Sequence, residues 1–183
     1  MNLFDSTQWR HHGLGMLQST PDAHGNRIHF WHPDLIDPTL EAPIHTHRWN
    51  LKSTVLVGNI LDELVTLRPC SAGKYVEWYT AHSQAPSVHR TEIQQRYNFT
   101  SFVRTYKEGD TYSIPTGVYH LTHIYAPCIT YVQRFNVQGF SKVLAPANTI
   151  PRNGVKDINQ DKEKIHHYHS LFVSLWLENE LSL

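Results

Sequence analysis

GDTYSIPTGVYH, residues 109–120, is the most informative stretch of this chain. Its spacing is G-x5-P-x-G-x2-H, running from Gly109 through Pro115 and Gly117 to His120. At the residue frequencies of this chain, chance produces the arrangement in about two of a thousand such sequences. Gly109 predicts a tight turn into a strand, and Pro115 with Gly117 predicts a turn between two strands. His120 then begins the next strand.

A second stretch, APIHTHRWNLKSTVLVG at residues 42–58, carries His45 and His47 two positions apart. With 14 histidines in 183 residues, chance alone gives about one such pair, and residues 167–169 hold another. In a strand, side chains two apart project to one face, so His45 and His47 can reach one point together. His120 on a facing strand supplies a third nitrogen. We therefore predict a metal site at these three histidines; the alternative is three hydrogen-bonded polar side chains in a barrel.

The stretch at 109–120 resembles the second motif of the cupin family, G-x5-P-x-G-x2-H-x3-N. It matches up to the last position, where Ile124 replaces the asparagine. The resemblance covers about residues 40–140. It implies an all-β fold, a cupin-type double-stranded β-helix (jelly-roll) barrel with a metal inside its mouth.

The first cupin motif, G-x5-H-x-H-x3-4-E-x6-G, matches in His45, His47 and Gly58. Thr39 stands where that motif begins with glycine, and Leu51 takes the place of its acidic ligand. The loss of the acid resembles the three-histidine iron dioxygenases, which include thiol dioxygenases. This resemblance implies a non-haem Fe(II)-dependent dioxygenase that uses O2 and a small-molecule substrate.

Three neutral imidazoles leave the +2 charge of a divalent ion uncompensated, which favours an anionic or chelating substrate such as a thiol or a carboxylate. Imidazole suits zinc and nickel as well as iron, so these are alternative metals. Two residues of the stretch CITYVQRF complete the predicted catalytic set: Arg134 to pair with a carboxylate and Tyr131 as a relay tyrosine. They have opposite parity along the strand, so only one can face inward.

Two other functions stay open. A metal-dependent isomerase or lyase acting on a sugar or keto acid would need a general acid or base near the metal, and Glu63, His123 and Tyr131 are its candidates. A non-catalytic cupin that binds a small molecule would instead have a closed metal site. His123 is three residues after His120 and so falls on the opposite face of a straight strand. Asp62 and Glu63 follow Gly58, and one of them could face the barrel mouth as a base or a fourth ligand; a solvated turn is the expected alternative.

The chain is expected to form a single domain over residues 1–183, with a barrel core at about 27–140 and an amphipathic C-terminal helix at about 157–180. Asp157 or Asn159 is the expected N-cap of that helix. A short helix or loop is expected before residue 27, and a loop over 143–156. Short β-rich runs predict strands at 27–32, 44–49, 53–67, 74–81, 99–106, 111–115, 119–125 and 128–137.

Sixteen basic and sixteen acidic side chains cancel, so composition gives no reason to expect nucleic acid or a membrane surface as a partner. Cys70 and Cys128 show no C-x-x-C spacing and are expected to be free thiols in a reducing compartment, which predicts a cytoplasmic protein. A homodimer is expected if residues 27–32 form an exposed edge strand.

Overall fold

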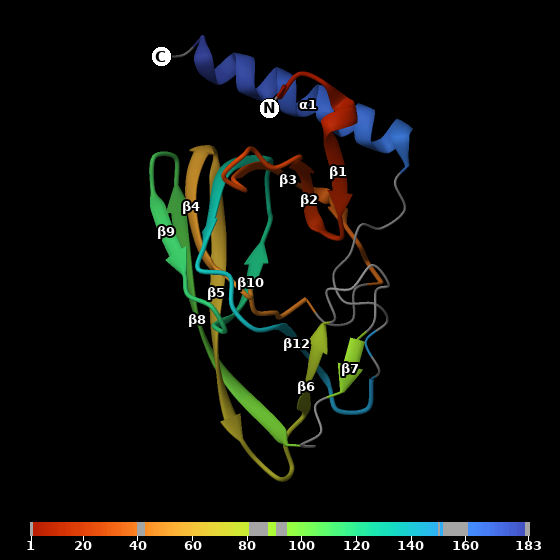
Figure 1. Cartoon of the computed structure of the whole chain (residues 1–183), viewed down its shortest axis with the longest axis vertical. Helices are drawn as coiled ribbons and strands as arrows, with labels where there is room; N and C mark the ends of the chain where they lie inside the picture. The colour runs from red at the N-terminus through yellow and green to blue at the C-terminus, as the bar shows by residue number, and fades with distance from the viewer. Residues whose placement is uncertain are drawn as a thin grey trace.

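The computed structural model describes residues 2–39, 43–80, 88–90, 95–149, 151 and 161–181. Two antiparallel β-sheets face each other, and a C-terminal helix lies across the outside of one of them (Figure 1). The first sheet has the order β1 (Trp9–His12), β2 (Leu14–Ser19), β3 (Arg27–Ile36), β11 (Cys128–Phe135), β4 (Asn50–Val57), β9 (Thr111–Ile114). The second has the order β10 (Tyr119–His123), β5 (Asn59–Pro69), β8 (Arg96–Lys107), β6 (Tyr75–Thr80), β12 (Ser141–Pro146), with β7 (Val88–Arg90) beside β6. The expected all-β fold with a C-terminal helix is confirmed.

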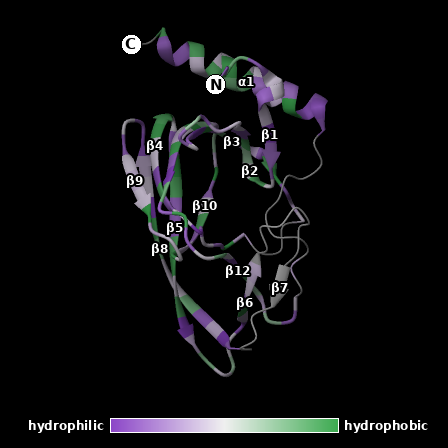
Figure 2. Ribbon diagram, viewed as in Figure 1, coloured by the Kyte–Doolittle hydropathy of each residue, from purple (hydrophilic) through white to green (hydrophobic). Residues whose placement is uncertain are grey.

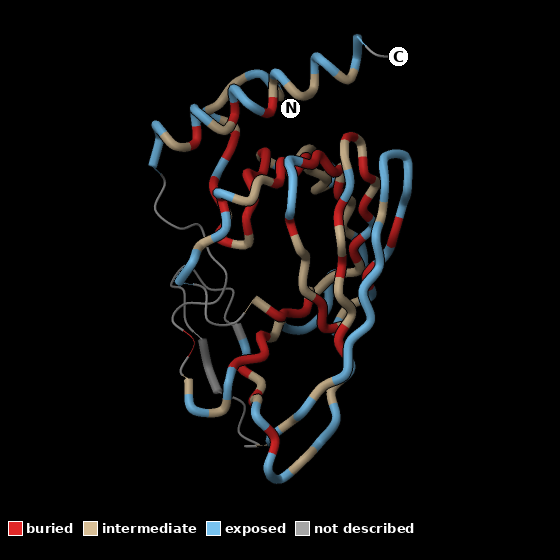
Figure 3. The backbone as a smooth tube through the Cα atoms, turned by 180° about the vertical axis from the view of Figure 1, so that it is seen from behind, coloured by how far each residue is buried: buried red, intermediate tan, exposed pale blue. Residues whose placement is uncertain are grey.

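The space between the sheets holds an apolar core contributed by both of them. Alternation along β4 buries every second side chain, as a strand with one covered face requires, and Figure 2 shows hydrophobic and hydrophilic residues interleaved along the strands. The buried segments gather in the body of the sandwich, and the hairpin tips stay exposed (Figure 3). The buried members are Met16, Trp31, Leu51, Val55, Ile60, Tyr112, Ile114, Ile124, Cys128 and Val132.

A second core lies on the outer face of the first sheet, under α1 (Lys162–Glu180). Phe172 of α1 is fully buried and packs against Trp9 and Phe30, with ring centroids 4.6 and 6.0 Å apart. The first sheet is therefore covered on both faces. The buried members are Trp9, Leu17, Ile28, Phe30, Leu35, Val57, Ile129, Ile165 and Phe172.

The helix begins at Lys162, five residues later than expected from the sequence. Asp161 is its N-cap, and its carboxylate accepts hydrogen bonds from the backbone N–H groups of Glu163 and Lys164. The N-caps expected from the sequence, Asp157 and Asn159, lie outside the described residues.

Two glycines shape turns that a side chain would disturb. Gly58 separates β4 from β5 at φ +80°, and a Cβ there would lie 2.9 Å from the carbonyl oxygen of Pro127. The run expected as one strand over 53–67 is therefore two strands joined at this glycine. Gly109 has φ +83° in the turn between β8 and β9, as the sequence predicted.

The structure corrects four further expectations. A short 3-10 helix is present before residue 27, at Ser6–Gln8, but the same segment also forms the strands β1 and β2, which were not expected. The expected loop over 143–156 begins inside β12. Residues 44–49 are not a regular strand; only His45 makes β-bridges. The run 27–32 belongs to β3, which lies between β2 and β11 and is not an edge, so the reason for expecting a homodimer through it fails. No described helix is long and apolar enough to cross a membrane.

Candidate metal centre

Backbone hydrogen bonds bring the three predicted ligands to one place. His45 forms an antiparallel bridge with His120 of β10, through N–H···O bonds of 3.0 and 2.9 Å. The carbonyl of His47 accepts a hydrogen bond from the N–H of Gly117 at 3.1 Å. The turn at Gly117 therefore fixes the position of the segment that carries His45 and His47. The ligand atoms of His45, His47 and His120, hereafter the three-histidine cluster, lie within 4.8 Å of one another.

The rings of the cluster face one another in the space between the sheets. Their centroids are 4.9 Å apart for His45 and His47, 4.5 Å for His45 and His120, and 4.9 Å for His47 and His120. The two Nε2 atoms of His47 and His120 are 3.0 Å apart. Nitrogens bound to one ion at about 2.0–2.1 Å, in tetrahedral or octahedral geometry, are roughly 2.8–3.4 Å apart. The spacing of this pair therefore fits two ligands of a single ion.

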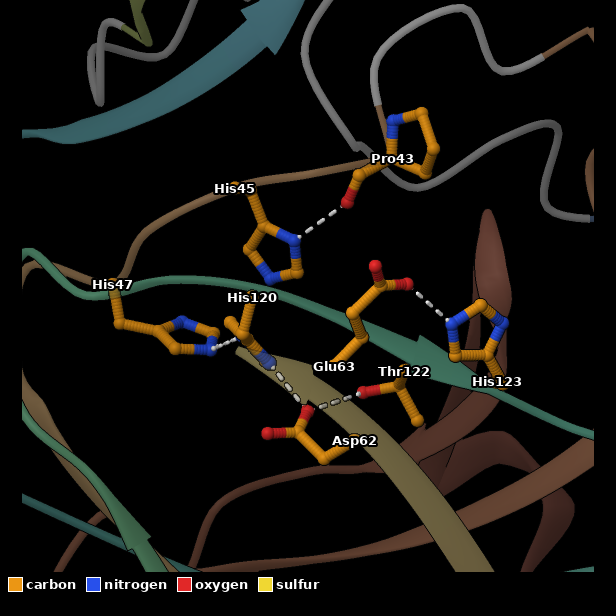
Figure 4. A network of polar contacts seen from close by, with 8 residues as sticks. All are labelled: Pro43, His45, His47, Asp62, Glu63, His120, Thr122 and His123. Atoms are coloured by element: carbon orange, nitrogen blue, oxygen red, sulfur yellow. Dashed lines mark hydrogen bonds and ion pairs between the residues drawn. The ribbon is translucent and has the colours of Figure 1, made fainter. Parts of the chain in front are cut away.

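Partners outside the cluster orient two of the rings. Nδ1 of His45 donates to the carbonyl oxygen of Pro43 at 2.9 Å, and Nδ1 of His120 donates to the carboxylate of Asp62 at 2.8 Å (Figure 4). A proton on Nδ1 leaves Nε2 as the atom with a free lone pair. Both rings are therefore in the tautomer that can bind a metal through Nε2.

Desolvation keeps His45 and His47 neutral. Desolvation lowers the pKa of His45 to about 3, and the neighbouring His120 adds to the shift. Desolvation likewise lowers the pKa of His47 well below its usual value, followed by the effects of His45 and His120. Neutral imidazoles are the form that binds divalent metals, so protons compete weakly for these two nitrogens near neutral pH.

Asp62 is the functional residue that the sequence analysis misplaced. It lies on β5, not in a solvated turn, and is 1% exposed behind His120. The sequence does carry a signal for this position. Ile60, Asp62 and Leu64 are spaced by two residues and so share one face of the strand, and Asp62 is the charged residue between two apolar ones. Such a carboxylate fixes the tautomer of a metal-binding histidine and raises its basicity.

Arg134 faces the side of the sheet on which the cluster lies. Its guanidinium carbon is 4.8 Å from the ring centroid of Trp49, and Trp49 stacks on His47 with centroids 5.4 Å apart. Nε of Arg134 donates to the carbonyl oxygen of Gly25 at 3.2 Å. Burial and the nearby Arg48 lower the pKa of Arg134. This arginine therefore stands beside the cluster with Trp49 between them.

Tyr131 does not share that position. It packs against the outer-face core under α1, on the opposite side of the sheet from Arg134. As expected from their positions along the strand, only one of Tyr131 and Arg134 faces inward, and that residue is Arg134.

Glu63 and His123 also point away from the cluster. Nε2 of His123 lies 2.7 Å from the carboxylate of Glu63, and the pair sits on the other face of β10 and β5 from His120 and Asp62 (Figure 4). His123 lines a groove of about 300 Å³ there, together with Leu121 and Tyr125. Neither residue completes the three-histidine cluster.

The donor set fits a divalent metal ion. It consists of three imidazoles, with no carboxylate in the described cluster and Leu51 buried in the core at the position of the cupin acid. Imidazole nitrogen suits iron, zinc and nickel alike, so the donors do not select among them. The fold therefore presents a candidate three-histidine site for a divalent metal ion between two antiparallel sheets.

Comparisons with known proteins give similarity in structure only. No protein-family model matches the chain, and no curated protein matches it in sequence. It is similar to the solved structure of hydroquinone 1,2-dioxygenase from Sphingomonas sp. TTNP3 with 4-hydroxybenzoate bound, at 11% identity and a TM-score of 0.34, over 70% of this chain and 68% of that one. It is also similar to hydroquinone 1,2-dioxygenase PnpCD in complex with Cd²⁺ and 4-hydroxybenzonitrile, at 13% identity and a TM-score of 0.32, over 66% of this chain and 64% of that one.

Proposed function

We propose that this protein is a non-haem Fe(II)-dependent dioxygenase that acts on a small anionic or chelating substrate, such as a thiol or a carboxylate. The observation that carries the proposal is the three-histidine cluster, whose nitrogens face one point with no acidic ligand among them. A divalent iron held by three protein ligands supplies open positions for a chelating substrate and for O2. His45, His47 and His120 would hold it, and Asp62 would keep His120 in the binding tautomer.

The charges beside the cluster support an anionic substrate. The guanidinium carbons of Arg48 and Arg134 lie 5.8 and 4.8 Å from the ring centroid of Trp49. In the described chain, neither arginine has a carboxylate within ion-pair distance. An anion bound between these two guanidinium groups would offset the repulsion of their positive charges. The planar guanidinium group also pairs with a carboxylate through two parallel hydrogen bonds. Arg134 would therefore orient the substrate through its acidic group.

The alternative functions receive less support. An isomerase or lyase needs a general acid or base near the metal, but Glu63, His123 and Tyr131 all face away from the cluster. A closed metal centre of a non-catalytic protein needs a fourth protein ligand. His123, on the same strand as His120, is paired with Glu63 on the other face and so does not supply that ligand.

Oxygen consumption tests the proposal. Protein reconstituted anaerobically with Fe(II) is added to air-saturated buffer containing a thiol, a β-diketone or a carboxylate from a panel, and O2 uptake is followed with an electrode. We expect uptake with at least one member, and both atoms of ¹⁸O2 in the product. His123→Ala is the matched control and should keep the activity, whereas His120→Ala should lose it. Iron-loaded protein that consumes no O2 with any member, but isomerises or cleaves a sugar or keto acid, would instead establish the alternative enzyme class.

A further inference from the structure

His29 is a fourth buried histidine on the side of the sheet that faces the cluster. It lies on β3, where residues 27, 29 and 31 share one face. Its ring meets that of Trp31 edge-on, with centroids 5.6 Å apart. Trp31 belongs to the core between the sheets, so His29 points into the same space as the cluster.

The ring nitrogens of His29 have no hydrogen-bond partner in the described chain, although the residue is only 7% exposed. The other buried histidines of the described residues are all bonded through a ring nitrogen: His11 to the carbonyl of Leu35, His45 to that of Pro43, His120 to Asp62 and His169 to the carbonyl of Leu3. Buried polar atoms in native proteins are nearly always paired, and an unpaired imidazole destabilises the fold. For stability alone a phenylalanine would serve better at position 29.

The surroundings of His29 are cationic and adjoin the metal centre. Desolvation lowers the pKa of His29 well below its usual value, and the charges of Arg27, His12 and Arg134 lower it further. The charge of protonated His29 in turn lowers the pKa of His47, so the two rings lie close enough to interact electrostatically. His29 is therefore neutral near pH 7 and offers one donor and one acceptor.

We propose that His29 hydrogen-bonds a hydroxyl group of the substrate, so that the substrate class is a small hydroxylated carboxylic acid. The carboxylate matches the permanent charge of Arg134, whereas a hydroxyl both donates and accepts and so matches a neutral imidazole. The chelating end of the same molecule then lies at the three-histidine cluster. This inference rests on the proposed function and extends it to the substrate.

Binding of matched acids tests the inference without turnover. Protein loaded with Zn(II), which is redox-inert, is titrated by calorimetry with acid pairs that differ by one hydroxyl: lactate and propionate, malate and succinate, 3-hydroxybenzoate and benzoate. We expect the wild type to bind at least one hydroxylated member more tightly than its partner. In His29→Phe that preference should fall by about tenfold. His169→Gln, which changes a hydrogen-bonded histidine of α1, should keep it.

Thermal unfolding separates binding from structure. His29→Phe should unfold at the same temperature as the wild type or higher, because it removes unpaired polar atoms. An unchanged hydroxyl preference in His29→Phe would overturn the inference, and a lower unfolding temperature with unchanged preference would make His29 structural. Zinc-loaded wild type that binds no member would overturn the substrate class and leave the metal site intact. Wild type that takes up no metal would overturn the proposed function itself.

Discussion

At the scale of single residues, the metal centre depends on groups that touch the ligands rather than on the ligands alone. The carboxylate of Asp62 accepts from Nδ1 of His120 at 2.8 Å and is almost fully buried. The carbonyl oxygen of Pro43 likewise accepts a hydrogen bond from Nδ1 of His45. These partners decide which nitrogen carries the proton, and therefore whether each ring presents a lone pair to the centre.

Asp62→Asn should weaken metal binding by about tenfold, because the amide still accepts a hydrogen bond but no longer carries the charge that raises the basicity of His120. Competition against a chelator of known affinity measures the change. Glu63→Gln is the matched control, since its carboxylate is next in the chain but contacts His123 on the other face. Equal affinities for wild type and Asp62→Asn would show that Asp62 does not act on the metal.

The ligands themselves could be predicted from the sequence, and their supporting residues could not. His45, His47 and His120 lie in spaced motifs whose turns, at Gly109 and Gly117, have the positive φ that the spacing requires. Asp62 and His29 lie in no motif. The roles of Asp62 and His29 depend on which residues of the neighbouring strands lie beside them. Sheet register decides this, and register cannot be read from the local sequence of one strand.

At the scale of elements, the helix α1 completes the sandwich without touching the metal centre. Its buried residues Ile165 and Phe172 cover the face of the first sheet that points away from the cluster. The segment holding His45 and Thr46 bonds instead to β10 and β12, on the other sheet. The fold's stability and the ligand geometry therefore depend on different contacts.

Phe172→Ala should reduce the free energy of unfolding by about 3–5 kcal/mol, because it leaves a cavity between the rings of Trp9 and Phe30. Urea unfolding measures this loss. Leu177→Ala, on the exposed side of the same helix, should change stability by less than about 0.5 kcal/mol. A loss below about 1 kcal/mol for Phe172→Ala would mean that α1 is not held by this core.

Most strands were predictable because their apolar residues alternate, but three features were not. The pair β1 and β2 is short and interrupted by Gly13, so its periodicity is hard to recognise. β12 ends at Pro146 and resembles a loop in composition. The segment around His45 bridges two strands with single residues, and its extended shape comes from tertiary hydrogen bonds rather than from its own pattern.

At the scale of the whole molecule, the interior between the sheets combines an apolar core with neutral histidines. An unfolded histidine titrates near pH 6.5, whereas in the folded protein the pKa of His45 is lowered to about 3. Unfolding therefore takes up protons between these values. The contribution of such a group to stability is complete above about pH 6.5 and is lost as the pH falls toward about 3.

Metal-free protein should accordingly become less stable from about pH 7 to about pH 5, by about 1.4 kcal/mol per pH unit for each buried neutral imidazole once below the unfolded pKa. Urea unfolding at several pH values gives the slope. His47→Gln should have a shallower slope than wild type, and His166→Gln, which alters an exposed residue of α1, should keep the wild-type slope. Identical slopes for wild type and His47→Gln would show that His47 is not buried in the neutral form.

The metal content of protein purified without a histidine tag tests the central claim most directly. Elemental analysis of the wild type, supplied with Fe(II), should give about one metal ion per chain. His120→Ala should lose that ion, and His123→Ala, three residues along the same strand, should keep it. Equal metal content in all three proteins, or no metal in the wild type after incubation with Fe(II), Zn(II) or Ni(II), would contradict the three-histidine site.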